Sequence, residues 1–182
     1  MKRSLYILWF AFLVAGCQDR IEEAGGGQGW LSVEFLTDKS VETRAGNEAC
    51  YSLVIENQEG KQVYSCEDCA SVSERILLKA GVYRLVASSG KDVEAGFDSP
   101  LYRAEQEINL QGGETKQVVL VCSQANVKVT VDYSDAVKRN FKEYSLLVEN
   151  GKGSLAFEKE EKRAGYLKVN EGTLLWNLTL HN

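Results

Sequence analysis

Four of the five cysteines in this 182-residue chain follow residue 49, and their spacing limits the chemistry that they can perform. Cys66 and Cys69 form a C-x-x-C motif, which supports thiol–disulfide exchange at a helix N-terminus and zinc binding when a second such motif is present. The chain has no second C-x-x-C, and this motif follows a predicted β-hairpin whose turn is Asn57–Gly60. If Asn57 faces Gly60, Cys50 lies opposite the motif, so we expect a disulfide from Cys50 to Cys66 or to Cys69.

Few other side chains offer catalytic chemistry. The single histidine, His181, is the penultimate residue, which argues against Ser-His-Asp and Cys-His catalysis and against histidine-based metal sites. The 26 Asp and Glu residues are scattered among 21 Lys and Arg residues, and no carboxylate pair stands out. A formal net charge of -5 without a basic stripe argues against a nucleic-acid partner. The sequence therefore predicts a protein that is not an enzyme and has neither a metal site nor a cofactor.

The remaining cysteine, Cys17, ends an export signal. Met1–Arg3 is a short basic segment, and residues 5–15 are uncharged and largely apolar. Eleven helical residues rise about 16 Å, which is too short to span a membrane and fits the apolar region of a signal peptide. Val14–Cys17 resembles a bacterial lipobox, in which the cysteine thiol is lipidated. We expect residues 1–16 to be the signal peptide and Cys17 to hold the mature chain on a lipid membrane; a buried helix ending in a cysteine is the alternative.

Residues 17–29 are polar and then glycine-rich, which predicts a flexible tether. Asp19, Glu22 and Glu23 follow the lipobox and resemble the surface-export signal of Bacteroidetes lipoproteins. An ordinary solvated tether is the alternative. The expected location is the bacterial outer membrane, with the chain lipid-anchored at the cell surface.

Apolar residues alternate along most of the remaining chain, which predicts short β-strands. Turn residues separate the strands every 8 to 12 positions or so, a spacing typical of a β-sandwich. One short helix is expected near residues 135–142, with Ser134 and Asp135 at its start. The connection from Ser88 to Arg103 is expected to be a long crossing loop. The clearest strand segments are residues 30–35, 51–55, 63–64, 76–78, 83–87, 107–110 and 118–122.

The chain also contains an internal repeat. YSLVIENQEGK at residues 51–61 matches YSLLVENGKGS at residues 144–154, with six of eleven positions identical. The preceding strand agrees, since Val33 aligns with Val129 at an offset of 96. The repeat predicts an all-β fold of tandem seven-stranded Greek-key β-sandwiches, of the transthyretin or immunoglobulin type.

The first sandwich is expected over residues 30–122 and the second over residues 123–182. Leu78–Gly81 aligns with Val169–Gly172, and the residues after Gly172 are too few for the last two strands of the first copy. Three interpretations are open. The chain is shortened, or the second domain is smaller, or an open groove and unpaired edges receive a strand from a partner protein.

The order of several segments resembles one family. After the lipobox come Thr43-Arg44-Ala45, LKAGVYRLVASSG from residue 78, GFDSPLY from residue 96 and CSQANVKVTV from residue 122. This set resembles the Bacteroidales lipoproteins grouped as domain of unknown function 4493, which are similar to the fimbrillins and their transthyretin-like β-sandwiches. The resemblance implies a surface lipoprotein for adhesion or pilus-like assembly, and it carries no catalytic residues. Arg44 resembles the maturation cleavage site of some fimbrillins; a surface residue in a loop is the alternative.

Two functions therefore remain open. The first is a structural, adhesive or fimbria-like assembly role, with another protein subunit as the partner. The second is a surface glycan-binding module, for which Trp30, Trp176, Phe97 and Tyr102 are the candidate contacts. Phe97 and Tyr102 are preferred because they lie in the predicted crossing loop, and loops often carry function. Packing against the opposite sheet is the alternative for all four aromatic residues.

Overall fold

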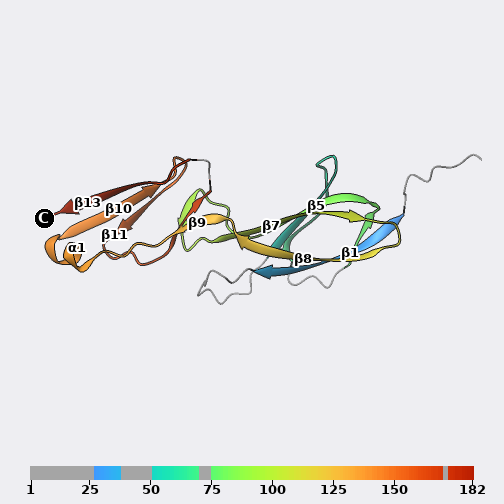
Figure 1. Cartoon of the computed structure of the whole chain (residues 1–182), viewed down its shortest axis with the longest axis horizontal. Coiled ribbons are helices and arrows are strands. Elements are labelled where there is room, and N and C mark those ends of the chain that lie inside the picture. Colours follow the sequence, from blue (N-terminus) through green and yellow to red (C-terminus); the bar gives the residue numbers. More distant parts are fainter. Residues whose placement is uncertain (1–26, 38–50, 70–74, 170–171) are drawn as a thin grey trace, which may run out of the picture.

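The computed structural model describes residues 27–37, 51–69, 75–169 and 172–182 (Figure 1). These residues form strands and one short helix, in agreement with the predicted all-β class. The elements are β1 (Gln28–Thr37), β2 (Tyr51–Asn57), β3 (Gln62–Cys69), β4 (Ile76–Lys79), β5 (Gly81–Gly90), β6 (Ala95–Phe97), β7 (Leu101–Leu110), β8 (Thr115–Gln124), β9 (Asn126–Val129), α1 (Asp135–Asn140), β10 (Glu143–Glu149), β11 (Ser154–Glu158), β12 (Gly165–Lys168) and β13 (Leu175–His181).

The first sandwich is a single seven-stranded sheet that curls into two layers. Its strand order is β3-β2-β5-β7-β8-β1-β4. The layers meet where β7 pairs with β8, and this pairing covers only Tyr102 with Gln124 and Arg103 with Ser123. β3, β2, β5 and β7 form one layer by antiparallel pairing. β8, β1 and β4 form the other, in which β1 runs parallel to β8.

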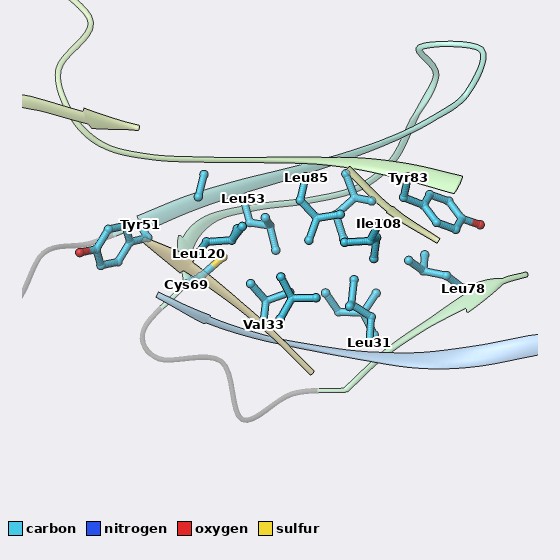
Figure 2. Packing of buried hydrophobic residues seen from close by; sticks show 14 of the residues in the cluster. Leu31, Val33, Tyr51, Leu53, Cys69, Leu78, Tyr83, Leu85, Ile108 and Leu120 are labelled. Carbon is cyan, nitrogen blue, oxygen red and sulfur yellow. The ribbon is translucent and has the colours of Figure 1, made fainter. Parts of the chain in front are cut away.

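Alternating apolar residues fill the space between these layers (Figure 2). Leu53 and Leu85 project from one layer toward Leu31 and Val33 of the other. All four are fully buried. The alternation read from the sequence is therefore confirmed, because each strand sends every second side chain into one core.

The β2–β3 hairpin turns at Asn57–Gly60 as expected, and the Gly60 amide donates to the Asn57 carbonyl at 2.9 Å. Its register differs from the expected one. The Asn57 amide donates to Lys61 rather than facing Gly60, and a bulge follows next to Glu56. A second shift lies between Tyr51 and Leu53, so the two strands slide relative to each other.

The Ser88–Arg103 segment is largely strand rather than the expected crossing loop. β5 extends to Gly90, and β7 begins at Leu101 and pairs with β5 over its whole length. Gly90 has a positive φ of 98°, and a Cβ at this position would collide with the Pro100 carbonyl. The chain can therefore pass this closely only with glycine there. β7 is also longer than the predicted strand at residues 107–110.

The second sandwich has two three-stranded layers, β11-β10-β13 and β6-β12-β9. β6 comes from the connection between β5 and β7, so a segment within the first copy adds a strand to the second. Phe97 of β6 lies opposite Gly165 of β12. Val148, Leu155, Phe157 and Leu167 are buried between the two layers. The two sandwiches follow one another along the long axis of the molecule (Figure 1).

The strand registers reproduce the sequence repeat. Leu31 of β1 pairs with Ile76 of β4, and its repeat counterpart Val127 of β9 pairs with Leu167 of β12. In the same way Leu53 pairs with Ala87, and its counterpart Leu146 pairs with Leu178. β9 to β13 are therefore the equivalents of β1 to β5, in the same order and with the same partners.

The short helix forms where expected. The Ser134 hydroxyl accepts a hydrogen bond from the Val137 amide at 3.4 Å, which caps the amino end. None of the helical residues is buried, however. The helix ends at Asn140, and the chain returns to extended backbone at Phe141.

Candidate functional site: the open side of the second sandwich

Three residues singled out in the sequence lie outside the described residues. These are Cys17, expected to be lipidated; Arg44, expected as a maturation cleavage site; and Cys50, expected to form a disulfide. The roles of Cys17 and Arg44 stay predictions.

The described cysteines lie in the first sandwich. Cys66 and Cys69 are joined to each other by a disulfide, so neither is available for the expected bridge to Cys50. The bulge in the β2–β3 register brings their Cα atoms to 5.8 Å. Cys122 is a free, buried thiol, and burial raises its pKa. The nucleophilic thiolate is thus disfavoured at Cys122, which packs in the core as an apolar residue.

The aromatic candidates for ligand contact lie in strands. Phe97 is in β6, where its ring meets that of Phe157 edge-on at 5.2 Å and carries the Arg163 guanidinium at 4.7 Å. Tyr102 is in β7 and only 8% exposed. The prediction that these two residues lie in a crossing loop is therefore wrong. Trp30 is 41% exposed and lies on the outer face of β1, opposite Leu77 of β4.

The largest exposed aromatic side chain belongs to β13. Trp176 is 70% exposed, and Leu178 and Leu180 are exposed on the same side of the strand, while the exposed Leu174 directly precedes it. β13 pairs with β10 so that Trp176 lies opposite the buried Val148. Because paired residues point to the same face of a sheet, the Trp176 row faces the interior of the sandwich. This row, which we call the β13 inner row, comprises Leu174, Trp176, Leu178 and Leu180.

The equivalent positions in the first sandwich are buried. By register, Trp176 and Leu178 correspond to Leu85 and Ala87 of β5. Leu85 and Ala87 are 0% exposed, whereas Leu178 is 46% exposed. In the first copy β7 pairs along β5, and β8 closes the opposite layer. In the part of the chain that the structure describes, no strand stands at the equivalent positions beside β13.

The opposite layer is open on the same side. β1 runs to Thr37 because its last residues pair with β8, as Phe35 does with Leu120. Its counterpart β9 ends at Val129, where its pairing with β12 ends. The following residues are held by side chains instead, since the Tyr133 hydroxyl donates to the Phe157 carbonyl at 2.5 Å. Adjacent edges of both layers are thus free among the described residues.

The far side of the second sandwich is closed by β6. The Lys168 ammonium lies 3.0 Å from Asp92 and 3.6 Å from Glu94, both in the segment that leads from β5 into β6. The hydrogen bond with Asp92 and its charge raise the pKa of Lys168. The Asp98 amide donates to the Ala164 carbonyl at 2.9 Å. These contacts fix the β6 edge and leave the β13–β9 side as the open one.

An ion pair between Arg163 and Glu161 lies beside Phe97 of β6. Arg163, whose guanidinium covers the Phe97 ring, lies 2.6 Å from a Glu161 carboxylate oxygen. Hydrogen bonds from the Arg163 side chain and amide lower the pKa of Glu161 to about 2. Glu161 is therefore ionised throughout the physiological range and orients Arg163 over the aromatic ring.

Within residues 27–37, 51–69, 75–169 and 172–182 there is no cluster of three metal-ligating side chains. The same residues contain no helix that is long and apolar enough to cross a membrane. The arrangement offers backbone edges and apolar side chains rather than catalytic groups. Such a surface can bind extended polypeptide.

The β13 inner row was not assigned in the sequence. Trp176 was considered as a glycan contact, with packing against the opposite sheet as the alternative, and no strand was assigned around it. The repeat held the signal, because extending the alignment of Leu78–Gly81 with Val169–Gly172 places Leu85 on Trp176. The exposure of the row could not be read in this way, since it depends on whether strands cover β13, and the described residues include none that do.

Comparison with known proteins agrees with this fold. The family model described as Domain of unknown function (DUF4493) matches residues 27–182. A search of curated protein sequences finds no match.

Several solved structures are similar to this chain at low sequence identity. A proposed polysaccharide-binding protein (DUF1812) from Bacteroides thetaiotaomicron VPI-5482 is 12% identical, with a TM-score of 0.52 over 83% of this chain and 76% of its own. A proposed adhesin from Bacteroides ovatus is 9% identical, with a TM-score of 0.48 over 85% and 72%. The fimbrial anchor protein Mfa2 from Porphyromonas gingivalis is 14% identical, with a TM-score of 0.38 over 85% and 74%. The first of these likenesses supports the tandem-sandwich fold.

Proposed function

This chain belongs to the family described as Domain of unknown function (DUF4493), and from that premise we propose that it is a non-catalytic lipoprotein of the bacterial cell surface with a structural role in assembly or adhesion. The β13 inner row carries the proposal. It places one Trp and two Leu residues on an exposed strand, with Leu174 directly before it, at positions that the first copy buries. A contiguous apolar surface beside a free strand edge is typical of a protein-binding site.

Anchoring is part of the same proposal. Cys17 is the lipidated residue, and residues 18–27 separate it from β1. The neighbouring folds include a proposed adhesin and a fimbrial anchor protein, which accords with a surface location. We expect the Cys17→Ser chain, expressed in a Gram-negative bacterium, to leave the membrane fraction, while the unchanged chain stays with it and incorporates labelled palmitate. Membrane retention of the Cys17→Ser chain would contradict lipid anchoring.

The assembly role is tested on β13. Trp176→Glu places a charge in the inner row, whereas Leu175→Glu places one on the opposite face of the same strand, where Leu175 is also exposed. We expect surface crosslinking of cells from the native source to join the unchanged and Leu175→Glu chains to partner subunits, and Trp176→Glu to lose these products. Equal crosslinking of both variants would show that the inner row is not the contact surface.

Proteolytic maturation at Arg44 would belong to this role. Arg44 lies in the segment between β1 and β2, so cleavage there would separate β1 from the rest of the first sandwich. β1 supplies Leu31 and Val33 to the core, and losing it would open that core as well. The amino-terminal sequence of the surface-extracted protein distinguishes the two states: it starts at Cys17 without cleavage and at Ala45 after it.

Glycan binding is a second candidate, favoured by one observation. Trp30 presents its ring on the outer face of β1 beside the exposed Leu77, as sugar-stacking aromatic residues do. The fold is also that of a proposed polysaccharide-binding protein. A glycan array compares the two roles, because glycan binding at this face is lost in Trp30→Ala and kept in Trp176→Ala.

A further inference from the structure

We propose that the outer face of β1 and β4 around Trp30 lies against the anionic headgroup layer of the membrane in which Cys17 is anchored. The inference rests on the proposed lipid anchoring and adds a second membrane contact, which the folded domain makes itself. A lipid chain combined with a basic and aromatic surface holds a protein on a membrane more firmly than the lipid chain does alone.

Trp30 lies near the point where the anchored segment joins the fold, since it is the third residue of β1. Figure 1 shows β1 beginning at one end of the molecule, with the second sandwich and β13 at the other end. Residues 18–27 separate Cys17 from Gln28, and a flexible chain of this length spans about 17 Å. Anchoring at Cys17 therefore keeps the amino end of β1 beside the membrane, at an effective concentration of about the millimolar range.

The surface at this end is apolar at its centre. Trp30 lies opposite Leu77 across the β1–β4 pair, and the two side chains are 41% and 44% exposed. Both point outward, because the neighbouring Leu31, Ile76 and Leu78 are buried in the core. β4 is the last strand of its layer, so no further strand among the described residues lies beside Leu77. An indole with an apolar neighbour suits the headgroup region of a bilayer, where Trp is enriched.

Positive charge flanks this apolar centre. Lys79 follows Leu77 by two positions in β4 and Arg75 precedes it by two, so alternation places both cations on the outer face. Both side chains are exposed, and neither forms a salt bridge with another described residue. An anionic membrane surface attracts Lys and Arg side chains that have no such partner.

Two carboxylates near Trp30 leave this positive charge in place. Glu114, whose carbonyl accepts the Trp30 amide, is paired with Lys116 at 3.0 Å. Glu34 lies four positions further along β1, away from the start of the strand. Trp30 is also the contact in the second candidate function, glycan binding. Lipid is favoured because the indole and both cations lie at the end of the molecule that the segment from Cys17 joins, whereas the second sandwich lies at the opposite end.

Quenching by brominated lipid tests the contact. The lipidated chain is purified from membranes and reconstituted in vesicles of equal parts phosphatidylcholine and phosphatidylglycerol, with and without bromine on the phosphatidylcholine chains. Cleavage before Cys17 removes Trp9, so Trp176→Phe leaves Trp30 as the only indole and Trp30→Phe leaves Trp176. We expect brominated lipid to lower Trp30 emission about twofold or more and to leave Trp176 emission unchanged.

Charge reversal tests the part played by the cations. In the chain whose only indole is Trp30, Arg75→Glu together with Lys79→Glu should reduce the quenching by at least half. Lys152→Glu, an equally exposed change in the turn between β10 and β11, should not reduce it. Equal quenching in both variants would overturn the recognition of anionic headgroups.

The remaining outcomes separate the lipid contact from its alternatives. Equal quenching of Trp30 and Trp176 would overturn the contact and leave anchoring at Cys17 intact. Alginate, a soluble acidic polysaccharide, would also overturn it by shifting Trp30 emission without lipid and abolishing the quenching, because the ligand would then be a glycan. Failure of the proposed anchoring would appear separately, as a Cys17 peptide without acyl mass in mass spectrometry.

Discussion

At the scale of single residues, equivalent positions of the repeat have different environments. Leu85 and Trp176 occupy the same place in their strands and face the same partner positions, Ile55 and Val148. Leu85 is enclosed, whereas most of the Trp176 surface is in solvent. The difference arises from what covers the strand rather than from the strand itself.

This contrast predicts that truncating the two side chains changes the free energy of unfolding by very different amounts. Leu85→Ala should lower the free energy of unfolding by about 2–5 kcal/mol, because it leaves a cavity in a closed core. Trp176→Ala should change it by less than about 0.5 kcal/mol, because little buried area is lost. Urea unfolding followed by far-ultraviolet circular dichroism measures both. A large loss of stability in Trp176→Ala would mean that the β13 inner row is already covered in the isolated chain.

A second prediction at the residue scale concerns how the stability of the protein changes at low pH. Folding lowers the pKa of Glu161 from 4.5 to about 2, so the folded state binds fewer protons than the unfolded state between these values. The stabilisation by the Glu161–Arg163 pair is therefore complete above about pH 4.5 and is lost as the pH falls toward 2. Glu161→Gln should be less stable than the unchanged chain at pH 7, and the difference should vanish near pH 2. Thermal unfolding across this range provides the measurement, and a constant difference would contradict it.

At the scale of elements, β6 is the strand that links the two copies. It interrupts the β5–β7 connection of the first sandwich and pairs with β12 of the second. Its residue Phe97 contacts Phe157 in the core of the second sandwich, and Arg163 covers the ring. Phe97 lies between β5 and β7 in the sequence but packs in the second sandwich. Removing its side chain therefore tests how much β6 stabilises the second sandwich.

We expect Phe97→Ala to destabilise the second sandwich selectively, by about 1–3 kcal/mol, since the ring is only partly buried. Hydrogen exchange should quicken in β10, β11 and β12 and stay unchanged in β2 and β5. Val121→Ala, on the exposed outer face of β8, is the control and should alter neither set. Equal acceleration in both sandwiches would show that they unfold as one unit.

The elements also show which parts of the fold can be predicted from sequence. Alternation predicted most strands of the first sandwich, and the match between residues 51–61 and 144–154 predicted a second copy of the same unit, because both features can be read directly from the sequence. The β6–β12 pairing was missed, since three residues without alternation carry no sign of a partner some 70 positions away. The hairpin register was also missed, because bulges beside Glu56 and Tyr51 shift it without a turn signal.

The candidate site could not be predicted from the sequence for a different reason. Leu174, Trp176, Leu178 and Leu180 alternate and are as apolar as any core strand, so sequence pattern alone would bury them. These residues are exposed because no strand among the described residues covers them. Their exposure therefore depends on the neighbouring strands and not on the sequence of β13 itself. The disulfide between Cys66 and Cys69 likewise depends on a local bulge rather than on the spacing of the motif.

At the scale of the whole molecule, the two sandwiches are joined twice. β8 continues into β9 through the single residue Ala125, whose amide donates to the Leu101 carbonyl at 2.7 Å. β6 returns from the first copy to pair with β12. Two connections restrict rotation of one sandwich against the other more than a single linker would. A partner bound at β13 would therefore be held at a fixed orientation to the first sandwich.

The parallel pairing of β1 with β8 has a mechanical consequence. A pull that enters at the amino end of β1 and leaves at the carboxyl end of β8 acts on opposite ends of two parallel strands. Their ladder, from Trp30 with Thr115 to Thr37 with Cys122, is then loaded in shear, and its hydrogen bonds must yield together rather than one at a time. In single-molecule pulling between residues 27 and 126 we expect a higher rupture force than in pulling between residues 81 and 110, which peels the antiparallel β5–β7 pair apart from one end. A chain tethered by its amino end and held by a partner beyond β8 would resist detachment through this pair of strands.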